Sequence, residues 1–211
     1  MFYKIIEDCS PYYIKFTYDG IEDLINFVKT QPLDLDNGRK YDSYIHYFFP
    51  LEIGQEIVKQ FPLSSKLRFK RKRAALMIMQ PGKFMYPHKD SPAELCSFNL
   101  PIKVSDEECV VSWYADEEFE DCTVLDSPSL INPEKTYSQR IVPDQYSKKS
   151  RIPVMQLRLK LGEFVLFNTT IFHSVDNTTS KNDRVILALR LIEDTEKLVT
   201  FEDAKSVLFK N

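Results

Sequence analysis

From about residue 72 onward, the chain consists of short runs of β-branched and aromatic residues separated by turn residues. This texture is typical of strands rather than helices. The predicted strands are Ala74–Gln80, Cys96–Ile102, Cys109–Ala115, Val154–Lys160, Glu163–Phe167, Ile171–Val175 and Arg184–Ile192. Parallel strands would need long helical crossovers between them, and no such pattern is present in this part of the sequence. We therefore expect an antiparallel double sheet or barrel.

The first seventy residues combine strand and helix patterns. Tyr12–Tyr18 predicts a strand, and Ile21–Lys29 has apolar residues at helical spacing. Pro50–Phe61 predicts a second helix that opens with proline and stops before Pro62. At the other end of the chain, Thr200–Phe209 predicts an amphipathic helix with a threonine cap.

These elements predict a mainly β (α+β) fold in a single domain over residues 1–211. A jelly-roll core, also called a double-stranded β-helix, is expected over about 72–192, and the helices of the α/β segment 1–71 buttress its larger sheet. The C-terminal helix occupies about 200–210. The polar, proline-containing stretch of about 116–151 is interpreted as a long insertion, and loops of that length are usually functional lids or partly disordered.

Composition narrows the class of protein. With 43% apolar residues the chain can fill a globular core, and a net charge of -3 gives no general attraction to nucleic acid or anionic membrane. The sequence shows neither a leader pattern nor an apolar run long enough to span a membrane, so a cytoplasmic protein with no membrane partner is expected. The cysteines at 9, 96, 109 and 122 are interpreted as small buried hydrophobes rather than disulfides or a zinc site.

Three residues suggest a metal site. His88 and Asp90 follow a predicted strand and turn, and side chains two residues apart on an extended segment point to the same side. His173 ends an apolar run, where a strand would deliver it to the mouth of a sheet. Two imidazoles and one carboxylate can occupy one face of an octahedral Fe(II), whereas structural zinc usually takes four ligands. The alternatives are an ordinary surface His and Asp, and a hydrogen-bonded core histidine.

Arg184 opens the last predicted strand, eleven residues after His173. Strand alternation places it on one face with Ile186, Ala188 and Arg190. A guanidinium at a barrel mouth is suited to a bidentate grip on a carboxylate. The alternative is a solvated arginine at the start of a strand.

The order of these motifs resembles the Fe(II)/2-oxoglutarate-dependent oxygenases, which have a jelly-roll core. The stretch from Gly162 to Asn177 followed by Arg184 looks most like the aspartyl/asparaginyl β-hydroxylase and free-proline hydroxylase branch. The stretch 97–102 is similar to the third core strand of that branch. The resemblance covers roughly residues 72–192.

The resemblance implies that His88, Asp90 and His173 hold Fe(II) as catalytic ligands. It also implies that Arg184 and Asn99 bind 2-oxoglutarate, and that O2 is consumed as succinate forms and a C–H bond of the substrate is hydroxylated. Amino acids and peptidyl residues are the implied substrates, with proline, aspartate and asparagine leading.

The chain departs from that branch at three positions. Ser97 and Asn99 stand where the branch often has Arg and His, and Ile186 stands where many relatives have Ser or Thr. Asn99 can still donate a hydrogen bond. Of Trp113 and Tyr114, which alternate on one predicted strand, one is expected to face the pocket.

Two other functions remain open on the sequence. A cupin-like metal protein has the same barrel and the same kind of ligands without using 2-oxoglutarate. A nucleic-acid-directed oxygenase or binding protein could use the basic cluster Lys66–Arg73, with Phe69 as a stacking ring. The competing interpretation of that cluster is a solvated, charge-protected segment.

Overall fold

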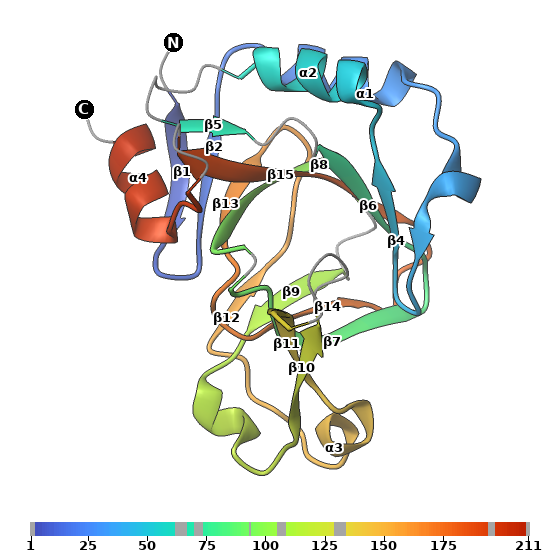
Figure 1. Cartoon of the computed structure of the whole chain (residues 1–211), viewed down its shortest axis with the longest axis vertical. Coiled ribbons are helices and arrows are strands. Elements are labelled where there is room, and N and C mark those ends of the chain that lie inside the picture. Colours follow the sequence, from blue (N-terminus) through green and yellow to red (C-terminus); the bar gives the residue numbers. More distant parts are fainter. Residues whose placement is uncertain are drawn as a thin grey trace.

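The computed structural model describes residues 3–61, 67–69, 74–92, 94–104, 109–128, 134–193 and 197–209. Two sheets face each other across the molecule, and helices lie at the outer side of the larger one (Figure 1). Every strand pairing within these sheets is antiparallel. The predicted mainly β, jelly-roll class is confirmed.

The larger sheet has the order β1-β2-β13-β8-β15-β6-β4-β3, and the short β5 pairs with β15. Its strands are β1 (Lys4–Cys9), β2 (Tyr13–Thr17), β3 (Arg39–Lys40), β4 (Ile45–Phe48), β5 (Leu67–Phe69), β6 (Ala75–Met79), β8 (Cys96–Lys103), β13 (Phe164–Asn168) and β15 (Arg184–Glu193). The smaller sheet has the order β10-β11-β7-β14-β9-β12. Its strands are β7 (Lys83–Lys89), β9 (Val110–Trp113), β10 (Val124–Pro128), β11 (Thr136–Ile141), β12 (Met155–Leu157) and β14 (His173–Asn177). Strands distant in sequence, such as β8 and β15, are neighbours in one sheet, while the intervening β9 and β14 belong to the other sheet, as in a double-stranded β-helix.

The helices form where apolar residues repeat at helical spacing. In α1 (Ile21–Thr30), Ile21, Leu24, Ile25 and Val28 are buried along one face. The acidic residues of its first turn complement the positive end of the helix dipole. Two further helices, α2 (Leu51–Lys59) and α4 (Phe201–Phe209), also pack on this side of the larger sheet.

Strand alternation divides the interior into two apolar cores. On β13, Phe164 and Leu166 join the core beneath the helices, whereas Val165 and Phe167 join the core between the sheets. Because both faces of this strand are covered, its sequence reads as a continuous apolar run. The space between the sheets is where β7 and β14 deliver their polar side chains.

The insertion at 116–151 is not the loop that its composition suggested. It contains the short helices η3 (Asp116–Phe119) and α3 (Pro143–Ser147), together with the hairpin of β10 and β11. The second strand of this hairpin pairs with β7 at His88 and Lys89. The prediction of a loop was therefore wrong, because strands exposed on one face and rich in polar residues lack the apolar runs by which we identified the others.

In the basic cluster, Lys66 and residues 70–73 lie outside the described residues. Phe69 is 1% exposed and packs in the core beneath the helices. The expectation of a stacking ring for a nucleic acid is wrong, because this ring cannot reach a base.

The cysteines are all free thiols. Cys96 and Cys109 are buried as predicted, whereas Cys9 and Cys122 are only half-buried. Among the helices that the structure describes, none is long and apolar enough to cross a membrane.

Candidate metal centre

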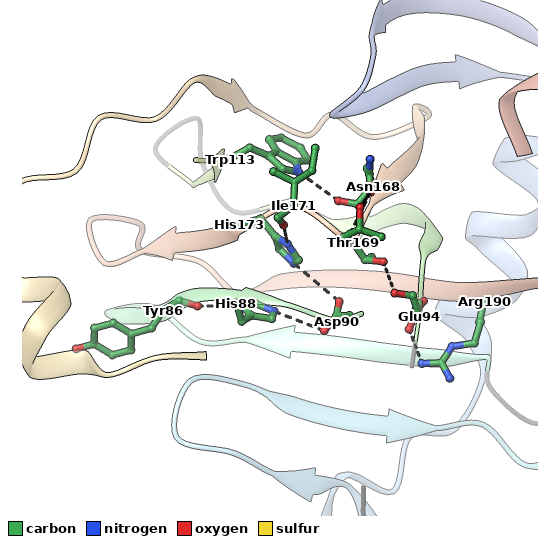
Figure 2. A network of polar contacts seen from close by, with 11 residues as sticks. Tyr86, His88, Asp90, Glu94, Trp113, Asn168, Thr169, Ile171, His173 and Arg190 are labelled. Atoms are coloured by element: carbon green, nitrogen blue, oxygen red, sulfur yellow. Dashed lines mark hydrogen bonds and ion pairs between the residues drawn. The ribbon is translucent and has the colours of Figure 1, made fainter. Parts of the chain in front are cut away.

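His88, Asp90 and His173 converge between the sheets, each offering one ligand atom, and these atoms lie within 4.8 Å of one another. Figure 2 shows the two imidazoles pointing at the carboxylate from the ends of β7 and β14. The Nε2 atom of His88 is 3.8 Å from one carboxylate oxygen of Asp90. The Nε2 atom of His173 is 3.9 Å from the other. These separations leave room for an ion between the ligands.

Each imidazole is oriented by its own backbone. The Nδ1 atom of His88 lies 2.9 Å from the carbonyl oxygen of Tyr86, and the Nδ1 atom of His173 lies 2.9 Å from that of Ile171 (Figure 2). A carbonyl oxygen can only accept, so Nδ1 carries the proton in both rings. The lone pair is then on Nε2, facing Asp90, which is the tautomer that a metal ligand requires.

A β-bulge in β7 aims His88 into the interior. His88 pairs with His173, but Met85 pairs with Val175, so three steps along β7 match two steps along β14. The surplus residue reverses the alternation between Met85 and His88. As a result, His88 lies on the same face as Met85, in the space between the sheets, and meets His173 there.

Hydrogen bonds fix the segment that carries Asp90. The backbone N–H of Asp90 donates to the carbonyl oxygen of Thr169 at 3.0 Å, and its own carbonyl oxygen accepts from the N–H of Glu94 at 3.1 Å. The Thr169 hydroxyl in turn donates to the carbonyl oxygen of Glu94 at 2.8 Å. The chain after β7 is therefore fastened to the chain between β13 and β14, and the carboxylate is held opposite both histidines.

Burial keeps His173 in the form that binds metal. Burial is the largest cause that lowers the pKa of His173, and together with the neighbouring His88 it brings the value to about 4, while Asp90 opposes the shift. The side chain of His173 is 5% exposed, compared with 30% for Asp90. His173 is therefore neutral at physiological pH, and its lone pair is available to a cation.

The donor set fits a divalent ion that prefers mixed nitrogen and oxygen ligands. Two neutral imidazoles and one carboxylate on one side of an ion match the facial arrangement used by non-haem Fe(II), with the remaining positions free for other ligands. Among the described residues, only this group of His, Cys, Asp and Glu side chains has a geometry that could hold a metal.

Arg184 lies on the same inner face of the barrel. Leu187 and Leu189 of β15 point into the core beneath the helices, so Arg184, Ile186 and Ala188 point between the sheets. Arg184 is 6% exposed, and burial lowers its pKa. Its Nε atom is buried without a hydrogen-bond partner, and no carboxylate among the described residues pairs with it. A buried guanidinium whose Nε has no hydrogen-bond partner is suited to an anionic ligand.

Asn99, the other residue expected to bind the co-substrate, is half-buried on β8. It pairs with Ala188 of β15 on one side and with Val165 of β13 on the other. Val165 belongs to the core between the sheets, so Asn99 faces the same space as Arg184.

The structure distinguishes Trp113 from Tyr114. Trp113 is fully buried between the sheets, where its ring lies 4.6 Å from that of Phe167. The Phe167 ring is 4.8 Å from that of His173, so these aromatic rings pack behind the candidate metal ligands. Tyr114 belongs to a separate cluster with Phe119 and Phe172. Trp113 is the residue that faces the site.

The sequence analysis missed one polar pair beside the site. Arg190, at the far end of β15 from Arg184, forms an ion pair with Glu94, which follows Asp90 by four residues (Figure 2). Alternation had placed Arg190 on the inner face, but its partner lies 96 residues away in the chain. No local pattern signals such a pairing.

No family model matches the chain, and neither does any curated protein. Among solved structures, HygX from Streptomyces hygroscopicus, with nickel, 2-oxoglutarate and hygromycin B bound, aligns with a TM-score of 0.50 and 8% identity. The alignment covers 84% of this chain and 81% of that one. At this identity the likeness is one of fold, and it agrees with the jelly-roll topology described above.

Two further solved structures align with lower TM-scores. An oxidoreductase of the 2OG-Fe(II) oxygenase family from Burkholderia pseudomallei has a TM-score of 0.49 and 10% identity, over 90% of each chain. An oxalate decarboxylase from Lactobacillus farciminis has a TM-score of 0.37 and 8% identity, over 78% of this chain. The chain spans about a third of that decarboxylase, 32% of its length.

Proposed function

We propose that this protein is an Fe(II)- and 2-oxoglutarate-dependent dioxygenase that hydroxylates a C–H bond of an amino acid or peptidyl residue. The observation that carries the proposal is the pairing of two features in one interior. A three-residue, metal-ready cluster lies between the sheets, and the buried Arg184 lies on the facing sheet without an anionic partner among the described residues. A metal site alone would not need the arginine.

Each candidate site residue would have a separate role. His88, Asp90 and His173 would hold Fe(II), which, when bound, supplies the oxidising chemistry with O2 and 2-oxoglutarate. Arg184 would pair with the carboxylate of 2-oxoglutarate that lies away from the metal, with Asn99 as a hydrogen-bond donor on the neighbouring strand. The buried rings of Trp113 and Phe167 would shield the inner side of the three ligands from water.

The substrate class is supported by the resemblance to the aspartyl/asparaginyl β-hydroxylase and proline hydroxylase branch. The segments that carry it, 97–102 and 162–177, form the strands β8, β13 and β14 around the site. We also place the enzyme in the cytoplasm, on the ground that its four cysteines are free thiols.

Release of succinate from 2-oxoglutarate tests the proposal directly. The purified protein is incubated with Fe(II), 2-oxoglutarate and a panel of amino acids, short peptides and oligonucleotides, and both succinate and O2 uptake are measured. We expect succinate formation that depends on Fe(II) and is abolished by Asp90→Ala. As a matched control, Asp183→Ala removes a carboxylate on the protein surface and should change nothing.

Two other outcomes of this assay would indicate a different function or a different substrate. Metal-dependent turnover that proceeds at the same rate without 2-oxoglutarate would indicate a cupin-like enzyme instead. Stimulation confined to oligonucleotides would keep the iron chemistry and refute the amino-acid assignment.

A further inference from the structure

Arg190 lies inside the barrel at the level of the metal ligands. It pairs with Ser97 of β8, which pairs with Phe167 of β13, and the Phe167 ring contacts His173. Arg184 lies six residues earlier on the same face, about 20 Å away along an extended strand. The two arginines therefore occupy opposite ends of the interior.

The guanidinium of Arg190 is held in place from the metal side. Glu94 accepts from its Nη2 atom at 2.5 Å, and the backbone of Glu94 is fastened to Asp90 and Thr169. The guanidinium also donates a hydrogen bond to the Tyr137 hydroxyl oxygen, and its Nε atom is buried without a hydrogen-bond partner. Since a guanidinium has five N–H donors, these contacts leave some of them unused. A rigid donor is thus available beside the metal ligands, on a side of the site that Arg184 does not serve.

Charges around Arg190 are already balanced. The negative charge of Glu94 offsets the positive charge of Arg190. Tyr137 of β11 lies against both side chains, and burial raises its pKa, so that it stays neutral. Tyr44, beside β4, is kept neutral in the same way. Arg140 of β11 is exposed, where water and salt screen its charge. A carboxylate placed here would find hydrogen-bond donors without a net positive field.

We propose that Arg190 is a substrate-binding residue and that it donates to a neutral carbonyl oxygen, such as that of an amide, rather than to a carboxylate. The substrate would then be a residue within a peptide, or an acylated amino acid, and not a free amino acid. This inference rests on the proposed function and chooses between the two substrate classes that it leaves open.

The experiment compares capped and free forms of the same side chain. The probes are N-acetyl-proline amide, N-acetyl-aspartate amide and N-acetyl-asparagine amide, each beside its free amino acid, and the readout is succinate released above the rate without substrate. Binding of 2-oxoglutarate to the Fe(II)-loaded protein is measured separately by anaerobic calorimetry. We expect kcat/KM to be at least tenfold higher for a capped compound than for its free counterpart.

Variants test the role of the arginine itself. Arg190→Met is combined with Glu94→Gln, because the single change would leave a buried carboxylate without its partner. We expect the KM of the capped compound to rise at least tenfold in this double variant, with the Kd for 2-oxoglutarate within twofold of wild type. Arg190→Lys, which keeps a donor, should recover part of the loss. The control Lys103→Met breaks an exposed ion pair with Asp183 and should leave KM unchanged.

Two results would overturn the inference while 2-oxoglutarate still binds. One is stimulation by free amino acids that equals or exceeds that by the capped compounds, or no stimulation by either. The other is a KM that does not change in the double variant. If the wild-type protein fails to bind 2-oxoglutarate, it is the proposed function itself that has failed, and this inference fails with it.

Discussion

Replacing Arg184 by methionine should weaken the binding of 2-oxoglutarate and, at the same time, stabilise the protein without its ligands. Methionine matches the length of the aliphatic part of arginine and carries no charge. Arg184 is 6% exposed, so the change removes a guanidinium from the interior rather than from the surface. Binding of 2-oxoglutarate should become weaker while the ligand-free protein becomes more stable. Because these two effects are opposite in direction, measuring both is a more demanding test than measuring a loss of activity alone.

The magnitude of the binding effect follows from what the co-substrate would lose. Breaking a buried ion pair by removing one partner costs about 3–5 kcal/mol. Since about 1.4 kcal/mol corresponds to a factor of ten, the Kd should rise by roughly two to three and a half orders of magnitude. The metal ligands are not altered, so the affinity for Fe(II) should stay the same.

The stability effect follows from the unsatisfied Nε atom. A buried polar group without a partner costs about 1–3 kcal/mol, and the variant removes this cost. We therefore expect the free energy of unfolding of the ligand-free protein to rise by about 1 kcal/mol in urea denaturation. Anaerobic calorimetry measures the predicted rise in the Kd for 2-oxoglutarate. The variant Lys103→Met, at an exposed position, serves as the control. A destabilised variant that binds 2-oxoglutarate as well as wild type would refute both parts of the reasoning.

Three further predictions concern the metal ligands and their surroundings. Asp90→Ala should lower the affinity for Fe(II) by at least about 100-fold in an anaerobic titration, because it removes a direct ligand; unchanged affinity would exclude this residue from the site. In the metal-free protein, the pKa of about 4 at His173 lies below its unfolded value, so the unfolded chain binds the extra proton first as the pH falls. Stability should therefore be lost between about pH 6.5 and 4, by roughly 3 kcal/mol, and His173→Gln should largely remove this pH dependence in urea denaturation. Trp113 is the single tryptophan and packs on Phe167 beside the ligands, so its fluorescence should be quenched by Co(II) at one equivalent; equal quenching in Asp90→Ala would contradict the placement of the site.

Much of the fold could be read from the sequence because its strands are either apolar throughout or sharply bounded. β8, β13 and β15 are covered on both faces, and such strands stand out as apolar runs. The strand β7 was not recognised, although it carries His88. Its bulge interrupts the alternation of apolar and polar residues, and Pro87 lies inside it. The period of two on which strand prediction depends is therefore absent at the very place where the site is built.

The three candidate metal ligands could be predicted from the sequence, but the residues around them could not. The spacing of His88 and Asp90, and the position of His173 at the end of an apolar run, indicated three side chains that the structure does bring together. The Arg190–Glu94 pair and the contact of Tyr137 with it depend on segments brought together only by folding. Side chains of this kind leave no mark on local periodicity, so only a three-dimensional structure identifies them.

The bulge in β7 also separates the number of residues in the strand from the direction of its side chains. Met85 and His88 are three residues apart, so regular alternation would put them on opposite faces, and the surplus residue is what keeps the imidazole inward. Deleting a single codon between those for Met85 and His88 would remove the bulge and leave the two residues two steps apart, which regular alternation also places on one face. A gene that is one codon shorter at this position would therefore still direct the histidine inward, with a regular strand in place of a bulged one.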